Sequence, residues 1–544
     1  MKIVIIGAVA AGTSAAAKAR RNSEDSEIVI YEKDRYISYT GCGMPYYLGG
    51  KVKDAGELTP RDPEFFMRKY NVRIEILHEV LSIDPKSKSL KIKNLATGEI
   101  FDDTYEKLVI STGAKAVLPP IKGSDNPNVF KFRNINDMND IKAFLTGKSP
   151  KTALIIGSGY IGLEVCENLK GIGMDVTIIE KLPQVTPGFD ADMAIYIQRH
   201  LEKHGIRVIT GTTVMEINDN SVILSDGDEI NSDIVIISAG IFPETELARK
   251  AGVLTGIAGA IRVDTRMQTN IEDIYACGDC AESFNLITGK PVYRPLGSTA
   301  NKTGRIAGEN ISGGDMEFRG ILGTGIFQVF DMAAGQTGLS EKEAIDNGYE
   351  IVTCHNIKPA RPEYLGGREL IIKGVASKTD GRLLGVQIIG PEGVDKRIDV
   401  FVTAITFGAK AADLVHLDLA YAPPFSTTKD PVMYTGMILE NEISKGRPLM
   451  TARELDALMK SGEPYNLIDV RAESQYAKDH IDTAKNIPLA QIRDAAGGLD
   501  REITAVVYCN RGVSGNAAQN ILLNKGFKRV FNLSGGYKQY IKRF

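Results

Sequence analysis

The chain has 544 residues, about 3.6 times a typical domain length, which predicts several domains. With 65 basic against 68 acidic residues, a net charge of −3 and no tryptophan, it lacks the footprint of a nucleic-acid binder. A hydrophobic content of 43% is typical of a globular protein, and no apolar run is long enough to span a membrane. Six cysteines are too few for a disulfide scaffold, so we expect a cytoplasmic protein whose important thiols are reactive.

Two segments repeat one pattern of strand, glycine turn and helix. Residues 2–7 form a short apolar run before an alanine-rich helix, and residues 28–32 form a second run. Residues 153–157 repeat the first run, with a helix from about Tyr160 and a further run at 176–180. Short apolar runs that alternate with helices are typical of parallel strands buried on both faces. We therefore expect two nucleotide-binding domains.

The pattern changes after about residue 320. Strand-like segments then alternate with turn signals up to about residue 445, and a helix is predicted near 395–408, which favours an α+β domain. Residues 445–448 (KGRP) predict a linker. A small α/β module is expected beyond it, with strands at YNLIDV, AVVYC and VFNL.

The second repeat contains a dinucleotide motif. Residues 157–162 (GSGYIG) match G-x-G-x-x-G, in which Gly157 and Gly159 permit a tight turn and a close approach to a pyrophosphate. Glu180, 18 residues after Gly162, ends the next strand, where a carboxylate accepts hydrogen bonds from both ribose hydroxyls. Because this carboxylate repels a 2′-phosphate, NADH is favoured over NADPH.

The first repeat has a weaker version of the motif. Residues 7–12 read GAVAAG, with valine in place of the middle glycine, but Glu32 follows Gly12 by 20 residues. Two further strands end in characteristic turns, KLVISTGA at 107–114 and IYACGD at 274–279. Together these features resemble the pyridine nucleotide-disulfide oxidoreductases, which bind two dinucleotides.

That resemblance covers roughly residues 1–440 and implies two cofactors. In this family the first unit binds FAD, the inserted second unit binds NAD(P)H, and the aspartate of the A-x-G-D strand binds the ribityl chain. The implied FAD-binding residues are Gly7, Ala10, Gly12, Glu32, Lys33, Val80, Thr112, Gly113, Gly278, Asp279 and Ala300. The implied NADH-binding residues are Gly157, Gly159, Tyr160, Ile161, Glu164, Glu180 and Gly240.

Residues 38–46 (SYTGCGMPY) contain one cysteine, where many disulfide reductases of this family have a C-x4-C pair. A lone Cys42 cannot form an internal disulfide. As a thiolate it can attack a substrate sulfur, hold a persulfide and receive electrons from the flavin, and a nearby helix N-terminus is expected to lower its pKa. The alternative is a buried, inert cysteine.

The segment resembles the S-F-x-N-C-G-x-P-Y motif of coenzyme A-disulfide reductases, with Tyr39 and Gly41 as departures. Related single-cysteine NADH oxidases and peroxidases carry a histidine in the first glycine loop. This chain has Ala10 there, which disfavours peroxide chemistry.

The same resemblance implies a homodimer. Residues 421–430 are similar to the family's Y-A-P-P-Y-S segment, and Tyr364 falls where a second family tyrosine is found. Tyr421 and Tyr364 would come from the partner subunit and donate hydrogen bonds to a departing thiolate; the alternative is that each only packs at the interface. The implied coenzyme A groove comprises Ser14, Lys18, Arg21, Ser38, Arg61 and Lys69, each of which singly is an ordinary surface residue.

A metal site is not expected. Cys277 and Cys280 form a C-x-x-C, but the residues between them belong to the flavin motif, so the spacing is interpreted as accidental. The following histidines are interpreted as structural, without ligand spacing: His78, His200, His204, His355 and His416.

Near the C-terminus a predicted strand ends at Cys509, before NRGVSG and a helix. Amides that converge on the sulfur beside a helix N-terminus would stabilise a thiolate or a persulfide. With the preceding LIDVR and His480, this order resembles a rhodanese over about residues 451–544. Ser514 and Gly515 replace the usual Arg-Ser, which weakens the inference that thiosulfate is the donor.

The sequence thus predicts an α/β protein with two Rossmann-like three-layer dinucleotide-binding domains, an α+β dimerisation domain and an α/β rhodanese domain. The expected boundaries are 1–112 with 249–322 for FAD, 113–248 for NAD(P)H, 323–445 for dimerisation and 451–544 for the rhodanese.

We expect a flavin-dependent enzyme that uses NADH to reduce a persulfide, polysulfide, CoA disulfide or CoA persulfide through Cys42. Cys509 would carry sulfane sulfur, and sulfide would be released. Two alternatives remain open: a plain CoA-disulfide reductase for thiol homeostasis, and a sulfur carrier or redox sensor without turnover. The sequence does not rank the sulfur substrates, and it leaves open whether Cys509 delivers to Cys42 in the same subunit and whether oxygen is an acceptor.

Overall fold

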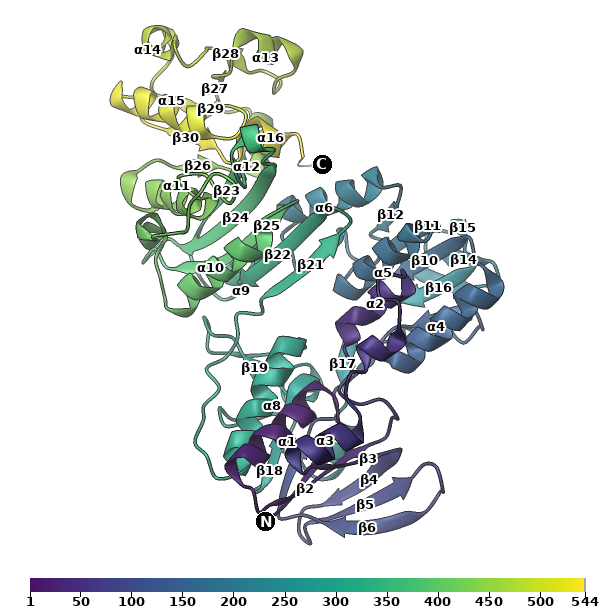
Figure 1. Ribbon diagram of the computed structural model, residues 1–544. Helices are drawn as coiled ribbons and strands as arrows, with labels where there is room; N and C mark the ends of the chain where they lie inside the picture. Colours follow the sequence, from purple (N-terminus) through teal and green to yellow (C-terminus); the bar gives the residue numbers. More distant parts are fainter. Residues whose placement is uncertain (543–544) are drawn as a thin grey trace. The chain divides into compact units, whose positions relative to one another are not determined.

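The computed structural model describes residues 1–542, and the chain forms two compact units (Figure 1). Unit 1 comprises residues 1–183 and 205–321, and unit 2 comprises residues 184–204 and those from 322 onward. The α/β fold class predicted from the sequence is confirmed in both units.

The first sheet of unit 1 is parallel, in the order β18-β7-β1-β2-β3. Its strands are β1 (Lys2–Ile6), β2 (Glu27–Glu32), β3 (Arg73–Ile76), β7 (Lys107–Ile110) and β18 (Ile274–Ala276). Isoleucines and valines fill both of its faces, as the apolar runs predict. An antiparallel sheet of β4 (His78–Asp84), β5 (Ser89–Asn94) and β6 (Ile100–Thr104) packs into the same core.

Helices α1 (Ala10–Asn22) and α8 (Gly297–Ile311) lie side by side in unit 1 (Figure 1). A Cβ at Gly304 would lie 2.3 Å from the Ala11 carbonyl oxygen, and one at Gly308 would lie 2.4 Å from that of Ala15. The alanine-rich sequence of α1 therefore serves close helix packing as well as the preceding turn. The short helices α3 (Pro63–Tyr70) and α7 (Glu246–Lys250) complete this part of the unit, whereas α2 (Met44–Leu48) packs against helices of the second sheet.

The second parallel sheet of unit 1 has the order β12-β11-β10-β16-β9. It comprises β9 (Val129–Lys131), β10 (Thr152–Ile156), β11 (Asp175–Glu180), β12 (Arg207–Thr210) and β16 (Ile234–Ile237), with α4 (Ile135–Lys148) and α5 (Tyr160–Gly171). A small sheet of β13 (Val214–Ile217), β14 (Ser221–Leu224) and β15 (Glu229–Asn231) lies beside it, and β8 (Ala114–Ala116) pairs with β17 (Ile241–Pro243). The second βαβ unit is confirmed, and β10 lies where the strand order reverses, the usual ligand crevice of such sheets.

Unit 2 contains an antiparallel sheet in the order β21-β22-β25-β24-β23. Its strands are β21 (Gly325–Val329), β22 (Met332–Gly338), β23 (Ile351–Pro359), β24 (Glu369–Ser377) and β25 (Leu383–Gly390). The helices are α6 (Ala191–Lys203), α9 (Glu341–Asp346), α10 (Val394–Thr406) and α11 (Pro431–Lys445), of which α10 matches the predicted helix. Lys373 of β24 is 1% exposed and pairs with Asp192 at 2.9 Å and Glu341 at 2.5 Å, which ties α6 and α9 to this sheet.

The C-terminal module of unit 2 is a parallel sheet in the order β26-β30-β29-β27-β28. Its strands are β26 (Leu449–Met450), β27 (Tyr465–Asp469), β28 (Lys485–Asn486), β29 (Thr504–Tyr508) and β30 (Val530–Leu533). Its helices are α12 (Ala452–Ser461), α13 (Glu473–Lys478), α14 (Ile492–Ala495), α15 (Val513–Asn524) and α16 (Gly536–Tyr540). Gly446, at φ +61°, ends α11 just before this module, where the linker was predicted.

Candidate functional site

The first glycine loop connects β1 to α1. Gly7 has φ +103°, and a Cβ at Gly12 would lie 1.9 Å from the Gly7 carbonyl oxygen, so neither position tolerates a side chain. Glu32 is buried at the end of β2 and accepts a 2.7 Å hydrogen bond from the Ala8 backbone N–H. Burial raises the pKa of this carboxyl group. The loop and acid have the form of a dinucleotide site despite Val9.

The other residues predicted to bind FAD follow the carboxyl ends of the same sheet. Lys33 follows β2, Thr112 and Gly113 follow β7, and Gly278 and Asp279 follow β18. Because parallel strands end at one edge, these residues share the crevice in which α/β sheets bind ligands. Ala10 and Ala300 lie on the adjoining helices α1 and α8, and Val80 lies on β4.

Sequence analysis missed Arg133 in this region. Its Nη2 lies 2.8 Å from Oδ2 of Asp279, and its Nε donates to the Ala114 carbonyl at 3.1 Å. Arg133 belongs to no motif and lies just before α4, so only the tertiary structure brings it to the aspartate of the flavin motif.

The second glycine loop connects β10 to α5 and is better formed. Gly157 has φ +102°, a Cβ at Gly162 would lie 2.2 Å from the Gly157 carbonyl oxygen, and the space around Gly159 is open. Glu180 accepts hydrogen bonds from the Ser158 N–H at 2.9 Å and the Leu182 N–H at 2.9 Å. The open glycine and the acid fit the pyrophosphate and ribose of a nicotinamide dinucleotide.

The remaining residues predicted to bind NADH lie close to this loop. Tyr160, Ile161 and Glu164 occupy the first turns of α5, and Gly240, at φ +104°, follows β16. Burial and the neighbouring Glu167 raise the pKa of Glu164 to about 7. Sequence analysis gave no signal that Glu164 would be partly protonated at neutral pH.

Cys42 lies in a short 3-10 turn (Gly41–Gly43) just before α2, and it is exposed. The α2 helix packs against α5 of the second sheet, and Lys51 pairs with Glu167 at 2.5 Å. Charges of Glu164, Arg133 and Asp279 all act on the thiol, so it stands among residues of both dinucleotide sites.

The predicted lowering of the Cys42 pKa is wrong for this structure. Although the residue is exposed, the surrounding protein partly desolvates the thiol and raises its pKa; the Glu164 carboxylate raises it too, and Arg133 offsets only part of the effect. The α2 helix has five residues, and its N-terminus does not overcome these two effects.

The residues predicted to line a coenzyme A groove fall into two groups. Ser14 donates to Oδ1 of Asn301 at 2.8 Å, and Lys18 pairs with Glu309, so both have partners within the protein. Ser38, at φ +46°, lies on the segment that leads to Cys42.

The other three residues surround two aromatic rings. The Arg21 guanidinium lies 5.7 Å from the centre of the Tyr70 ring, the Arg61 guanidinium 5.6 Å from Phe65 and the Lys69 ammonium 5.3 Å from Phe65. These side chains, from α1 and the region of α3, form a basic and aromatic surface. Such a surface suits a phosphorylated adenine nucleotide.

Tyr364 and Tyr421 lie on the surface of unit 2 and are 77% and 49% exposed. Phe407 and Phe425 in the same domain are 81% and 72% exposed. An apolar groove of about 520 Å³, which Phe407 and Leu417 help to line, lies beside α10. Exposed aromatic side chains and an apolar groove on one domain are typical of a protein–protein interface.

Cys509 follows β29 and lies at the start of a loop that ends in α15. Its Sγ accepts a 3.2 Å hydrogen bond from the Gly512 N–H, and Gly512 has φ +94°. A Cβ at Gly536 would lie 2.3 Å from the Cys509 carbonyl oxygen, so the turn at Gly536 packs directly against the cysteine loop. The Gly512 amide and the N-terminus of a 12-residue helix thus lie at the sulfur.

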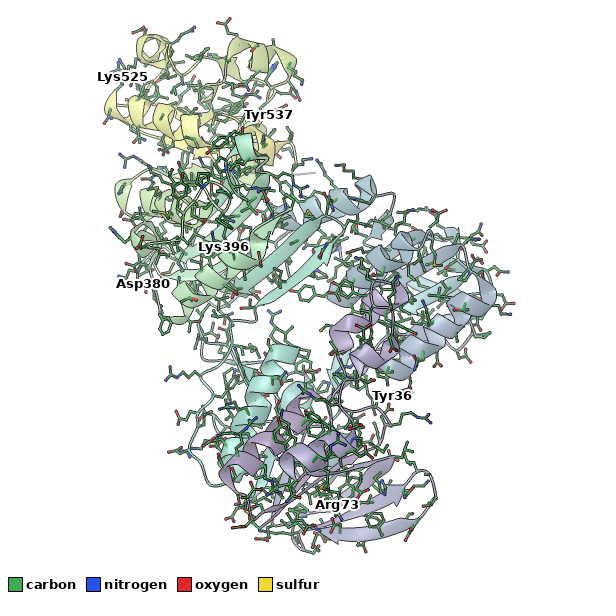
Figure 2. The ribbon with its side chains drawn as sticks, in the orientation of Figure 1. Tyr36, Arg73, Asp380, Lys396, Lys525 and Tyr537 are labelled. Carbon is green, nitrogen blue, oxygen red and sulfur yellow. The ribbon has the colours of Figure 1, made fainter. Side chains whose placement is uncertain are left out.

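A buried arginine contacts this loop and its neighbours. Arg471 pairs with Asp469 at 2.6 Å, lies 4.1 Å from the Tyr537 ring centre, and donates to Oδ1 of Asn510 at 3.4 Å. Tyr537, labelled in Figure 2, donates its backbone N–H to the Cys509 carbonyl at 2.8 Å. The LIDVR motif therefore fixes the loop and its cysteine. His480 stacks on Tyr476 at 3.9 Å.

The rhodanese module is docked onto the antiparallel sheet of unit 2. Glu369, the first residue of β24, pairs with Arg511 of the cysteine loop at 3.0 Å and with Lys538 at 2.6 Å. His355 of β23 donates its backbone N–H to Oγ of Ser534 at 2.8 Å. These contacts turn the loop toward β23, and no sequence motif signalled them.

Lys358 of β23 is the second residue that sequence analysis missed. Its ammonium lies 3.9 Å above the Tyr434 ring. Burial and the nearby Arg511 lower its pKa, while the Cys509 sulfur, as a thiolate, acts in the opposite direction. The antiparallel-sheet domain thus contributes a cation that acts on the Cys509 sulfur.

The remaining cysteines are structural in their surroundings. Cys277 and Cys280 are fully buried and carry free thiols, and burial raises the pKa of both. Cys280 points its sulfur toward the Cys277 carbonyl at 3.3 Å.

Two histidines differ from the prediction. His200 and His204 lie one turn apart on α6, and both face the carboxylate of Asp331. The prediction that they lack ligand spacing is therefore wrong.

Sequence comparisons agree with this architecture. The family model for pyridine nucleotide-disulphide oxidoreductases matches residues 1–295, the dimerisation-domain model of that family matches 326–431, and the rhodanese-like domain model matches 451–543. The chain belongs to the pyridine nucleotide-disulphide oxidoreductases and carries a rhodanese-like domain. It is therefore an oxidoreductase, and FAD and NAD(P)H are the cofactors of its family.

Several individual proteins are similar to this chain over most of its length. A protein of Methanocaldococcus jannaschii named NADH oxidase is 37% identical over 438 residues, 79% of this chain and 97% of its own. The reduced CoADR-RHD of Bacillus anthracis is 35% identical, with a TM-score of 0.97 over 100% of this chain and 98% of that one. An NAD-dependent persulfide reductase from A. fulgidus is also 35% identical, with a TM-score of 0.92 over 99% and 100%. Within residues 1–542, no helix is long and apolar enough to cross a membrane.

Proposed function

We propose that this protein reduces coenzyme A persulfide with NADH and releases sulfide. The observation that carries the proposal is the position of Cys42, the one exposed cysteine among the described residues, which stands among charged residues of both dinucleotide sites. The names of two similar structures, CoADR-RHD and NAD-dependent persulfide reductase, support the same chemistry.

The proposed reaction balances around one sulfur atom. The Cys42 thiolate attacks the outer sulfur of the persulfide, the S–S bond of the substrate breaks, and the coenzyme A thiolate leaves. FAD, when bound, supplies the two-electron relay from NADH to the cysteine sulfur. The S–S bond on Cys42 then breaks, hydrogen sulfide is released, and the thiol is restored. Overall, NADH, a proton and the persulfide give NAD⁺, coenzyme A and hydrogen sulfide.

The chain's own residues have distinct parts in this scheme. Glu180 selects NADH because its carboxylate repels a 2′-phosphate. Arg21, Arg61 and Lys69 bind the phosphates of coenzyme A, and Phe65 offers a ring on which the adenine stacks. Substitution of Lys69 by methionine is expected to raise the KM for the persulfide while kcat is kept, since this contact is equal in ground and transition states.

The rhodanese module is proposed to carry sulfane sulfur on Cys509. The Gly512 N–H and the start of α15 stabilise a negative outer sulfur, and Lys358 adds a cation from the neighbouring domain. A tethered carrier raises the effective concentration of an unstable persulfide near its acceptor. We retain the four domains with the boundaries predicted from the sequence.

The acceptor is tested by NADH consumption with coenzyme A persulfide, coenzyme A disulfide or oxygen. We expect the persulfide to give the highest kcat/KM and to yield one sulfide per NADH. Substitution of Cys42 by serine is expected to abolish this activity, whereas Cys166→Ala, at a buried free cysteine, retains it. If Cys42→Ser keeps full turnover, the mechanism is wrong, and faster turnover with oxygen would indicate an oxidase instead.

We further propose a homodimer in which Tyr421 and Tyr364 reach the partner subunit's cysteine site. The exposed aromatic side chains and the apolar groove of the dimerisation domain support this arrangement. Mixed dimers of Cys42→Ser and Tyr421→Phe chains provide the test. If the tyrosine acts across the interface, each mixed dimer has one intact site and regains activity; if it acts within its own chain, no site is intact.

A further inference from the structure

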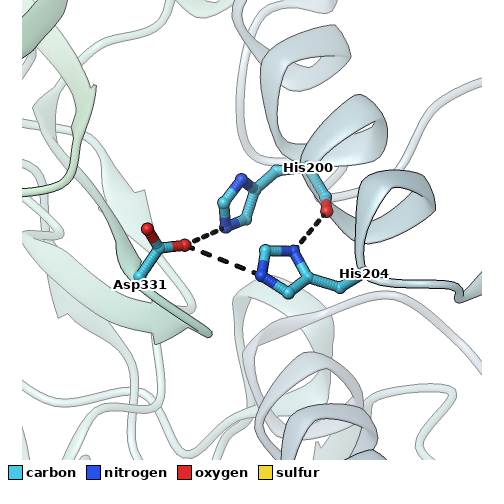
Figure 3. Close-up of side chains that lie close together, drawn as sticks. All are labelled: His200, His204 and Asp331. Carbon is cyan, nitrogen blue, oxygen red and sulfur yellow. Dashed lines mark hydrogen bonds and ion pairs between the residues drawn. The ribbon is translucent and has the colours of Figure 1, made fainter.

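Two histidines and an aspartate of unit 2 converge at one point (Figure 3). His200 and His204 lie on α6, and Asp331 lies in the turn between β21 and β22. Nε2 of His200 is 3.1 Å from Oδ1 of Asp331, and Nε2 of His204 is 3.7 Å from the same oxygen. None of these residues belongs to the two dinucleotide sites or to the cysteine loop.

The hydrogen bonds of the two rings place a hydrogen on each Nδ1, so in the neutral imidazoles both Nε2 atoms present a lone pair. Nδ1 of His204 lies 2.9 Å from the His200 carbonyl, which can only accept, so Nδ1 carries the hydrogen. The His200 ring bonds the backbone of Val329, and its buried Nε2 makes no hydrogen bond even though Oδ1 of Asp331 lies 3.1 Å away. The bond to Val329 is therefore made by Nδ1. Two nitrogen lone pairs and a carboxylate oxygen thus face one another, an arrangement that repels unless a cation lies between them.

We propose that His200, His204 and Asp331 bind a divalent transition-metal ion of the zinc type. Imidazole nitrogens and a carboxylate oxygen are ligands that Zn²⁺ prefers. Ligand atoms at 2.0–2.1 Å from a tetrahedral ion are roughly 3.3 Å apart. The contacts of 3.1 and 3.7 Å are close to that spacing, so small side-chain movements suffice.

Neighbouring residues hold the three ligands in place. Nη1 of Arg368 lies 3.1 Å from the other carboxylate oxygen of Asp331, which leaves Oδ1 for the ion. The Phe330 ring stacks on His204 at 4.1 Å with an interplanar angle of 3°. Outer contacts of this kind orient metal ligands in proteins. The Asp331 side chain is 59% exposed, so water could complete the coordination, and the ion would connect α6 to the β21–β22 turn.

The experiment measures zinc bound to the FAD-loaded enzyme after treatment with a chelator and dialysis against zinc. We compare wild type with His204→Gln and with His416→Gln, an exposed histidine of the same unit. Elemental analysis should show one more zinc per chain in wild type and His416→Gln than in His204→Gln. Zinc should raise the melting temperature of the first two proteins only. Because every protein keeps Cys42 and Cys509, zinc bound to thiols cancels in the comparison.

A second variant controls for misfolding of His204→Gln. Asp331→Asn keeps the shape of the turn and removes the charge, and it should weaken zinc binding at least tenfold while the flavin absorbance is unchanged. Equal zinc content in wild type, His204→Gln and Asp331→Asn would overturn the proposal. It would mean that a shared proton, as in a simple histidine–aspartate ion pair, occupies the position between the rings.

Discussion

A buried ion pair anchors the segment that carries Tyr421. Arg397 is 1% exposed, its Nε lies 3.0 Å from Oδ1 of Asp430, and its Nη2 lies 2.9 Å from Oδ2. Asp430 also accepts from Oγ of Ser426 at 2.6 Å and from the Val432 N–H at 2.9 Å, which begins α11. Removing the arginine therefore leaves a buried carboxylate at the end of the tyrosine segment.

The expected cost of Arg397→Met follows from this burial. Removal of one partner of a buried pair costs about 3–5 kcal/mol, because the remaining charge is uncompensated. For a unit of roughly 150–250 residues, each kcal/mol lowers the melting temperature by about 2–4 °C. We expect the transition of unit 2 to fall by roughly 6–20 °C.

A matched arginine on the surface provides the control. Nε of Arg382 lies 2.6 Å from Oδ2 of Asp380, but these side chains are 46% and 39% exposed, and Figure 2 labels Asp380. Such exposed pairs contribute at most about 1 kcal/mol, so Arg382→Met should cost at most about 4 °C.

The assay is thermal unfolding of the holoenzyme, followed by circular dichroism, together with NADH turnover on the persulfide. Below its transition, Arg397→Met should lose kcat because the Tyr421 segment is released, while the KM for NADH is unchanged. Equal melting temperatures for Arg397→Met and Arg382→Met would show that the buried ion pair does not anchor this segment.

Three further predictions concern the chemistry. As pH rises through about 7, Glu164 ionises and opposes thiolate formation at Cys42. Glu164→Gln should therefore lower the pH midpoint of Cys42 alkylation, which mass spectrometry measures. An unchanged midpoint would contradict this prediction. Glu180→Gln should raise the ratio of NADPH to NADH kcat/KM about tenfold, or 1.4 kcal/mol, because the charge that repels the 2′-phosphate is removed; a constant ratio would assign selectivity elsewhere. Lys358→Met should slow sulfane transfer to Cys509 about tenfold, whereas Lys525→Met, on the surface of the rhodanese module (Figure 2), should not.

Residue type and spacing were enough to predict the helices, strands and glycine loops. The turns at Gly7 and Gly157, the acids that end the following strands, and the glycines around Cys509 are local features. Each depends on the backbone conformation and burial of a few consecutive residues, so residue type and spacing were sufficient to predict them.

The electrostatics around the cysteines could not be read from the chain, because they arise from residues that folding brings together. Glu164 raises the Cys42 pKa from a helix of the other dinucleotide domain, and Lys358 approaches Cys509 from the dimerisation domain. The carboxylate that faces His200 is that of Asp331, which lies in a turn far along the chain. Charge interactions and desolvation depend on distance in space and not on separation along the chain. A motif can therefore name a reactive residue, but the fold decides which charges surround it.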